Sequence, residues 1–99
     1  MKKAQVIWSD QALVNLETIF DFLEEKSPIA AQRIIEELIG RANQLETFPE
    51  SGSIQQNLNV KSEYRYLAEG NYKIIYRYQV EQQVVLLRKC LTFASIQRK

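Results

Sequence analysis

The spacing of apolar residues changes midway along this chain, and the change restricts the fold more than any other feature. From residue 12 to residue 48, apolar side chains recur every three or four positions, which is the period of a helix with one buried face. From residue 64 onwards, aromatic and β-branched residues dominate, with turn signals at residues 69–71 and 81–83. The pattern predicts an α+β protein in which helices precede antiparallel strands.

Local signals place the expected elements. Residues 3–8 (KAQVIW) are typical of a short strand, and Ser9 or Asp10 can cap a helix after it. Ser27 followed by Pro28 is a common start for a second helix, because the missing N–H of proline costs nothing in the first turn. Helices joined by so short a turn should lie antiparallel as a hairpin. After a loop with at most a short strand at residues 54–62, strands are expected at residues 64–68, 72–80 and 84–93.

Chain length limits the number of cores. A chain of 99 residues buries only about 60 to 65% of its unfolded surface, which favours one core over two. We therefore expect a single domain over residues 1–99, in which a short N-terminal strand and an antiparallel helical hairpin pack on a three- to four-stranded, mainly antiparallel sheet.

Composition excludes several kinds of site. The chain has no histidine and one cysteine, Cys90, so we expect neither a metal site nor a catalytic triad, and no cofactor. The apolar neighbours of Cys90 indicate a buried structural thiol. No apolar run approaches the roughly 18 residues of a membrane helix, and no signal peptide is recognisable. A cytoplasmic protein with no membrane partner and no small-molecule substrate is expected.

Charge is divided unevenly along the chain, although the net charge is only +1. Residues 1–60 carry five Lys/Arg and nine Asp/Glu, a net charge of −4, whereas residues 61–99 carry eight and three, a net charge of +5. The C-terminal part is therefore the part expected to meet phosphate groups or an acidic partner.

Pairing of the expected strands sorts their side chains onto two faces. If Gly70 and Asn71 form a two-residue turn, Leu67 pairs with Ile74 and Arg65 with Tyr76. If Glu81 and Gln82 likewise form a tight turn, alternation along the strands separates an inner face from an outer one. The inner face, which the helices should cover, contains Leu67, Ile74, Tyr76, Tyr78, Val85, Leu87 and Leu91, with Arg65 and Lys89 at its margins. The outer face contains Tyr64, Tyr66, Lys73, Ile75, Arg77, Leu86 and Arg88.

The outer face is the candidate binding surface. Its arginine and lysine side chains can supply charge-assisted hydrogen bonds to phosphate, and its tyrosines can supply stacking planes. Solvated cations on an open sheet face are the alternative interpretation.

Four segments of the chain, taken in order, resemble one known family. WSDQALVNLETIFDFLEEKSPIAAQRIIEEL resembles that family's Trp-Ser opening and its S-P-x-x-A start of the second helix. LETFPESG resembles the helix exit L-x-x-x-P-x-x-G, RYLAEGNYKIIYRY the core hairpin R-x-L-x-x-G-x-Y-R-I-I-Y, and VVLLRKCLTF the final strand. Over nearly its full length the chain thus resembles the ParE/RelE superfamily of toxins from type II toxin–antitoxin systems.

The resemblance implies a small toxin of the plasmid-stabilisation type, closer to ParE, that arrests growth when it is free of the antitoxin encoded beside it. ParE-type toxins poison DNA gyrase without being enzymes, whereas RelE-type toxins cleave messenger RNA on the ribosome. Whether this chain is an enzyme therefore depends on its branch of the superfamily.

Individual positions bear on that choice. Arg65 matches the arginine that opens the family's hairpin motif, and Lys73 stands where the motif usually has arginine. Tyr64 and Tyr66 occupy positions where RelE-like nucleases tend to place lysines, and residues 93–94 are Phe and Ala where such toxins carry basic residues. Because general acid–base catalysis contributes about 10² to 10⁴ in rate, these absences favour the ParE-like function.

Two alternatives stay open. In a ribosome-dependent endonuclease, the expected catalytic groups are Tyr66, Lys73, Arg77 and Arg88. A degenerate toxin would only bind its antitoxin. Contacts with the target or the antitoxin are expected at Tyr64, Arg65, Tyr66, Lys73, Arg77 and Arg88.

The resemblance also implies how the antitoxin binds, with an extended C-terminal segment that contains a helix. Two places suit such a segment: the groove between the helical hairpin and the sheet, and an exposed sheet edge with unpaired backbone groups. The positive charge of residues 61–99 favours an acidic segment.

Overall fold

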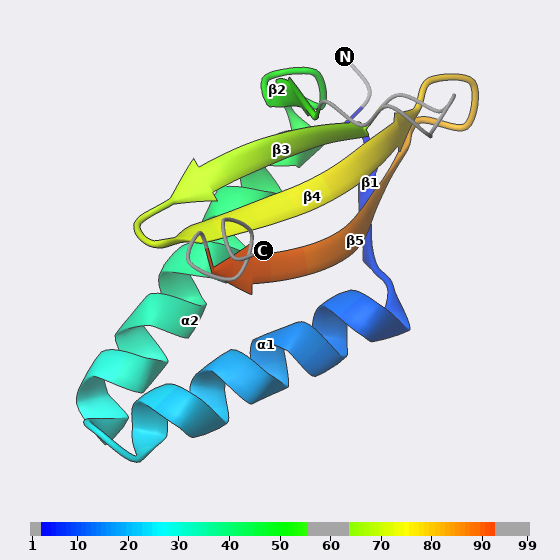
Figure 1. Ribbon diagram of the computed structural model, residues 1–99. Helices are drawn as coiled ribbons and strands as arrows, with labels where there is room; N and C mark the ends of the chain where they lie inside the picture. Colours follow the sequence, from blue (N-terminus) through cyan, green and yellow to red (C-terminus); the bar gives the residue numbers. More distant parts are fainter. Residues whose placement is uncertain (1–2, 56–63, 93–99) are drawn as a thin grey trace.

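Two helices cover one face of a five-stranded sheet in the computed structural model of the protein, which describes residues 3–55 and 64–92 (Figure 1). In chain order the elements are β1 (Gln5–Trp8), α1 (Asp10–Glu24), α2 (Pro28–Asn43), the 3-10 helix η1 (Gln44–Glu46), β2 (Ser53–Gln55), β3 (Tyr64–Glu69), β4 (Tyr72–Gln79) and β5 (Val84–Thr92). The strand order is β1-β5-β4-β3-β2, and the pairing is antiparallel except between β1 and β5. The predicted α+β fold is confirmed.

The sheet has more strands than the three to four expected, because the short β2 pairs with β3. This strand has only three residues and no clear alternation, so its pairing depends on the neighbouring strand more than on its own sequence. The rest of the predicted loop, residues 56–62, and the end of the predicted last strand, residue 93, lie outside the described residues.

Both helices begin where their caps predict. The Ser9 hydroxyl accepts a hydrogen bond from the Ala12 N–H at 3.1 Å, and the Ser27 hydroxyl accepts one from Ala30 at 3.2 Å. Pro28 occupies the first turn of α2, as expected. The buried sides of the two helices face the sheet, and the turn that joins them projects beyond it (Figure 1).

The turn at Gly70 sets the register of the central hairpin. Leu67 pairs with Ile74 and Arg65 with Tyr76, as predicted, and Gly70 has a φ of +58°, a conformation that favours glycine. The β4–β5 pairing also follows the prediction up to Tyr76 and Leu87.

Beyond Leu87 an irregularity shifts the register of β5 by one residue. Ile75 pairs with Lys89, so Arg88 is the extra residue of a β-bulge, and the alternation along β5 reverses. Lys89 therefore belongs to the outer face and not to the margin of the inner face, where it was predicted. Cys90 is buried at 2% exposure, and the predicted inner position of Leu91 is wrong, since Leu91 pairs with Lys73 on the outer face.

The bulge forms where β1 ends and α1 takes its place beside β5. The Ser9 N–H donates to the Leu87 carbonyl at 3.0 Å, and the Ser9 hydroxyl donates to the Arg88 carbonyl at 3.2 Å. The Asn15 side-chain oxygen accepts from the Cys90 N–H at 3.0 Å. Ser9, the N-cap of α1, and Asn15 of α1 thus bond to β5 where β1 has ended, beside the bulge.

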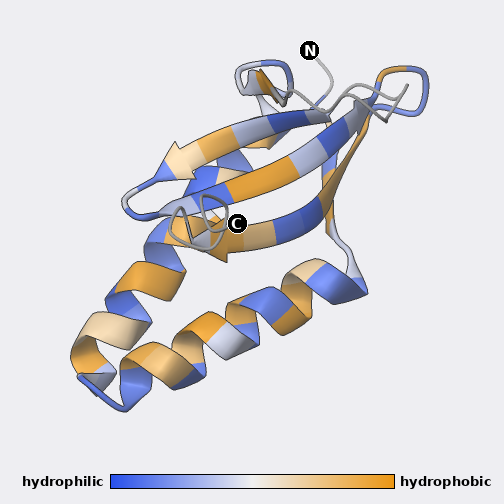
Figure 2. Ribbon diagram, in the orientation of Figure 1, coloured by the Kyte–Doolittle hydropathy of each residue, from blue (hydrophilic) through white to orange (hydrophobic). Residues whose placement is uncertain are grey.

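The core lies between the helices and the inner face of the sheet. Its largest fully buried side chains are Tyr76, Leu38, Leu45, Ile74, Leu87 and Val85. Apolar and polar residues alternate along the strands and helices, as the periodicity requires (Figure 2). Neither helix in the described part of the chain has the length and apolar content needed to cross a membrane.

Candidate functional site on the outer sheet face

The outer face of the sheet, which lies opposite the helices, brings together most of the predicted site residues. Paired residues share a face, so the register places Tyr66, Ile75 and Lys89 in one row across β3, β4 and β5. The row on one side contains Ala68, Lys73 and Leu91, and the row on the other side contains Arg77, Leu86 and Ile7.

The centre of this face is apolar. Ile75 lies in the middle row, and Leu86 lies beside Ile7, which is 39% exposed on β1. Lys73 and Arg77 stand on either side of Ile75, four residues apart on β4, so their Cα atoms are separated by roughly 13 Å. The two side chains therefore leave the sheet on either side of an aliphatic strip formed by Ile75, Leu86 and Ile7, and their backbone positions are not adjacent.

Lys73 is held by an aromatic ring. Its Nζ atom lies 4.0 Å from the centroid of the Tyr66 ring, within the range of a cation–π contact. The contact covers one face of the tyrosine ring, so that this face cannot stack on a base. It also places the ammonium of Lys73, a β4 residue, over a side chain of β3. The two groups form one unit in this structure.

Arg65 is separated from the other predicted binding residues. Its guanidinium donates to the carbonyls of Glu50 and Gly52 at 3.2 and 2.9 Å. In the sheet, Arg65 on β3 is the strand partner of the buried Tyr76 on β4. These hydrogen bonds connect the segment after η1 to β3, so Arg65 stabilises the fold here and does not extend onto the outer face. Arg88 is exposed at the bulge, and Tyr64 is half-buried at the start of β3.

Lys89 lies on the outer face, although the sequence pattern predicted it at the margin of the inner face. Nothing in the local sequence distinguishes the bulge, because its cause is the end of β1, a strand some 80 residues earlier in the chain. With Lys89, the outer face has a cation in its middle row as well as at Lys73 and Arg77.

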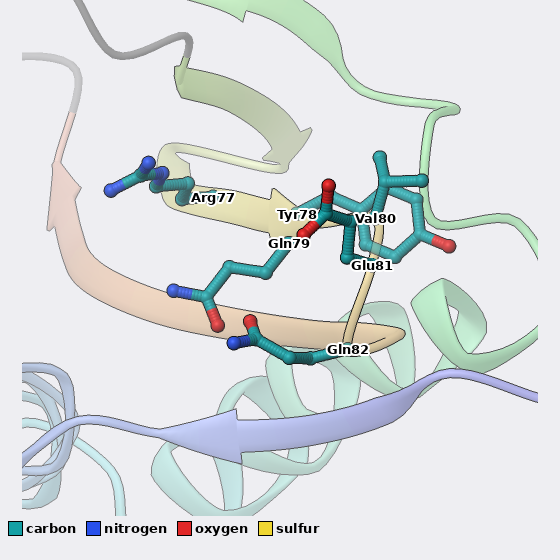
Figure 3. Close-up of a pocket in the computed structure, with 6 residues that line it drawn as sticks. All are labelled: Arg77, Tyr78, Gln79, Val80, Glu81 and Gln82. Atoms are coloured by element: carbon teal, nitrogen blue, oxygen red, sulfur yellow. The ribbon is translucent and has the colours of Figure 1, made fainter.

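A shallow pocket of about 390 Å³ lies at the end of the outer face, around the β4–β5 turn (Figure 3). It is lined by Arg77, Tyr78, Gln79, Val80, Glu81 and Gln82. The side chains of Arg77, Gln79 and Gln82 extend toward the same side of the hairpin (Figure 3). The pocket lining therefore offers amide groups, the Arg77 guanidinium and the Glu81 carboxylate as polar contacts.

The predicted groove between hairpin and sheet is a second pocket, of about 230 Å³. Its lining consists of Leu23, Arg33, Ile34, Glu37, Leu38, Glu69, Gly70, Asn71 and Tyr72. Charged side chains at its margin are engaged, since Arg33 contacts Glu37 at 3.3 Å and Arg41 contacts Glu69 at 3.6 Å. The groove thus combines an apolar floor with a charged rim.

Three buried groups of the inner face have raised pKa values. Burial raises the pKa of the Cys90 thiol from 9.0 to about 11, and burial also raises the pKa values of Tyr72 and Tyr76. A neutral, buried thiol is a poor nucleophile, in agreement with a structural role for Cys90. Among the described residues, no group of three His, Cys, Asp or Glu side chains is placed to hold a metal ion.

Comparison with solved structures defines the class of fold. The chain is similar to the chromosomal ParDE toxin–antitoxin system from P. aeruginosa, with a TM-score of 0.74 and 14% identity, over 91% of this chain and 96% of that one. It is also similar to the RelBE2 toxin–antitoxin complex from Mycobacterium tuberculosis, with a TM-score of 0.65 and 18% identity, over 91% and 98%. The fold is that of the ParE/RelE toxins.

The sequence places the chain within that class. Residues 6–88 match the family described as the ParE toxin of type II toxin–antitoxin system, parDE. The protein belongs to this family and is a toxin of a type II toxin–antitoxin system. It is also 41% identical over 51 residues to Toxin RelE2 of Caulobacter vibrioides, a match that spans 52% of this chain and 58% of that relative.

Proposed function

We propose that this toxin arrests growth by poisoning DNA gyrase without acting as an enzyme, and that a cognate antitoxin neutralises it in the cytoplasm. One observation carries the choice between target classes: the aliphatic Ile75 separates Lys73 from Arg77 on the outer sheet face, and Lys73 is engaged with Tyr66 at 4.0 Å. An apolar strip flanked by cations suits contact with a protein segment, such as that of the antitoxin, better than a phosphoryl-transfer site, and this argues against a nuclease.

A nuclease centred on this face would need groups that move protons and stabilise charge at one phosphate. Ile75 occupies the position between Lys73 and Arg77, Leu86 pairs with Arg77, and the Cα atoms of the two cations are roughly 13 Å apart. Residues 93–94 are Phe and Ala where RelE-like toxins carry basic residues, and they lie outside the described residues. The described part of the face therefore favours docking over chemistry.

Ribosome-dependent cleavage of messenger RNA is the second candidate. The exposed cations Arg88 and Lys89, together with Lys73 and Arg77, form a positive surface that an RNA backbone could contact. In that case Tyr66, Lys73, Arg77 and Arg88 are the groups to test for catalysis. A chain that binds its antitoxin but arrests no growth would instead be the degenerate form.

The antitoxin fits the groove between the hairpin and the sheet. The apolar floor formed by Leu23, Ile34 and Leu38 suits the apolar side of a helix, and the similar ParDE and RelBE2 structures are toxin–antitoxin systems. The positive charge of the sheet favours an acidic segment of the antitoxin beside it.

The experiment that tests the proposal compares two activities of the purified toxin after release from its antitoxin. We expect inhibition of gyrase supercoiling and accumulation of cleaved DNA, while a message translated in parallel on ribosomes stays intact. A cleaved message together with fully active gyrase would reject the proposal and establish the nuclease. The toxin–antitoxin complex is the control, because it should be inactive in both assays.

A further inference from the structure

The turn between α1 and α2 exposes large apolar side chains. Ile29 is 84% exposed and Phe22 is 59% exposed, on either side of the turn. Lys26 lies between them in sequence, with its Nζ atom 5.1 Å from the centroid of the Phe22 ring. We call Phe22, Lys26 and Ile29 the hairpin tip. Figure 1 shows that this end of the hairpin projects away from the sheet.

The fold does not require these apolar side chains. Phe22 and Ile29 are not among the buried residues of the two helices, which are Ala12 and Ile19 on α1 and Ala31, Leu38 and Ala42 on α2. Polar residues at positions 22 and 29 would serve the core equally well. Exposed aromatic and aliphatic side chains of this kind are typical of the central anchors of a protein interface.

The hairpin tip is also partly organised. A lysine over an aromatic ring restricts the ring's rotamers, and the contact is worth about 0.5 to 1 kcal/mol at exposed sites. A side chain that is already ordered loses less conformational entropy on docking.

Charge around the hairpin tip indicates the partner's chemistry. Asp21, Glu24 and Glu25 are exposed beside it, against Lys26 and Arg33, and Arg33 is paired with Glu37 at 3.3 Å. This acidic surround disfavours an acidic antitoxin segment, which the positive sheet attracts, and it disfavours the anionic surface of a membrane. It suits a protein pocket that is apolar inside and carries Lys or Arg at its rim.

From these observations we infer that the hairpin tip is the surface with which the toxin docks into an apolar, basic-rimmed pocket of its target protein. The inference rests on the proposed function, because it requires the target to be a protein surface. It assigns the target and the antitoxin to different places on the toxin: the target to the hairpin tip, and the antitoxin to the groove and the sheet.

The test uses Phe22→Gln and Ile29→Gln, with Phe48→Gln as a matched control, because Phe48 is 63% exposed on another part of the molecule. Thermal unfolding of all three variants should match the wild type, since each changes an exposed side chain. We expect each tip variant to inhibit gyrase at least roughly tenfold less well, and the control to inhibit it as the wild type does. Antitoxin affinity should change less than about twofold in all three.

Equal inhibition by the tip variants and the wild type would overturn the inference. So would an equal loss in Phe48→Gln, or a loss of antitoxin affinity as large as the loss of inhibition. Binding of the wild type to phosphatidylcholine vesicles that Ile29→Gln abolishes would assign the tip to a membrane instead and overturn it too.

The failure of the proposed function is distinguishable. If the wild type arrests growth but leaves gyrase active, the proposed function fails, and growth arrest by the same variants then tests the tip. Arrest lost only in the tip variants supports a protein target other than gyrase, whereas undiminished arrest overturns the inference.

Discussion

The phenol of Tyr76 joins the sheet to the segment that follows the helices. Its hydroxyl is buried, accepts a hydrogen bond from the Gly52 N–H at 3.0 Å and donates one to the Pro49 carbonyl at 2.9 Å. Gly52 lies so close to this ring that a Cβ atom there would be 2.6 Å from the hydroxyl and 2.7 Å from the Tyr66 carbonyl oxygen. Tyr76 thus satisfies the Gly52 N–H and the Pro49 carbonyl, and this arrangement has room only because residue 52 is a glycine.

Gly52→Ala should therefore destabilise the protein. The backbone carbonyl cannot move away from the added methyl group without disturbing β3, so the free energy of unfolding should fall by about 1 to 3 kcal/mol. Gly40→Ala is the matched control, because nothing lies within 4 Å of a Cβ there and the residue is inside α2. The control should raise the free energy of unfolding by roughly 0.5 to 1 kcal/mol. Urea denaturation of both variants measures the difference, and equal stabilities would contradict the account.

At the scale of elements, α1 completes the hydrogen bonding of β5. The strand continues to Thr92, whereas its parallel neighbour β1 ends at Trp8. The side-chain oxygen of Asn15 on α1 accepts a hydrogen bond from the Cys90 N–H, so the helix stabilises the strand by this hydrogen bond as well as by burial. The position of the bulge, and hence the place of Lys89 on the outer face, depends on this contact between a helix and a strand.

Asn15→Ala should weaken the end of β5. The Cys90 N–H would lose its acceptor, at a cost of about 1 to 3 kcal/mol in the free energy of unfolding. Asn15→Asp keeps a side-chain oxygen and should retain most of the stability. Amide hydrogen exchange at Cys90 provides the local measurement: we expect faster exchange in Asn15→Ala than in Asn15→Asp. Protection that is identical in the two variants would show that the amide does not depend on this acceptor.

At the scale of the whole molecule, charge separates into two layers. The helical layer, residues 10–46, carries eight Asp/Glu and three Lys/Arg, whereas residues 64–92 of the sheet carry two and five. The helices cover one face of the sheet (Figure 1), so the acidic and basic segments of the chain lie in different layers. A partner meets opposite electrostatic surfaces depending on the side from which it approaches.

Replacing Lys73, Arg77 and Arg88 together with Gln should weaken antitoxin binding and flatten its dependence on salt. Removing three positive charges from the sheet face lowers the attraction for an acidic segment, and the loss should be largest at low ionic strength. Affinity measured at two salt concentrations tests this, with Lys2→Gln/Lys3→Gln/Lys26→Gln, which also removes three positive charges, as the control for a general change in net charge. An affinity that is unchanged at both salt concentrations would exclude the outer face from antitoxin binding.

The sequence by itself determined what depends on near neighbours. Apolar periodicity predicts the helices and strands, Ser9 and Ser27 predict the helix starts, and the turn at Gly70 predicts the register of the central hairpin. These features are local, since each depends on residues a few positions apart.

Only the tertiary structure decided which side chains share the candidate site. The bulge at Arg88 moves Lys89 to the outer face and Cys90 into the core, where β1 has ended and Ser9, the residue that caps α1, and Asn15 of α1 bond to β5. Arg65 leaves the predicted site because carbonyls 13 and 15 residues earlier accept its hydrogen bonds. Contacts between segments far apart in the chain set these positions, and no local pattern records them.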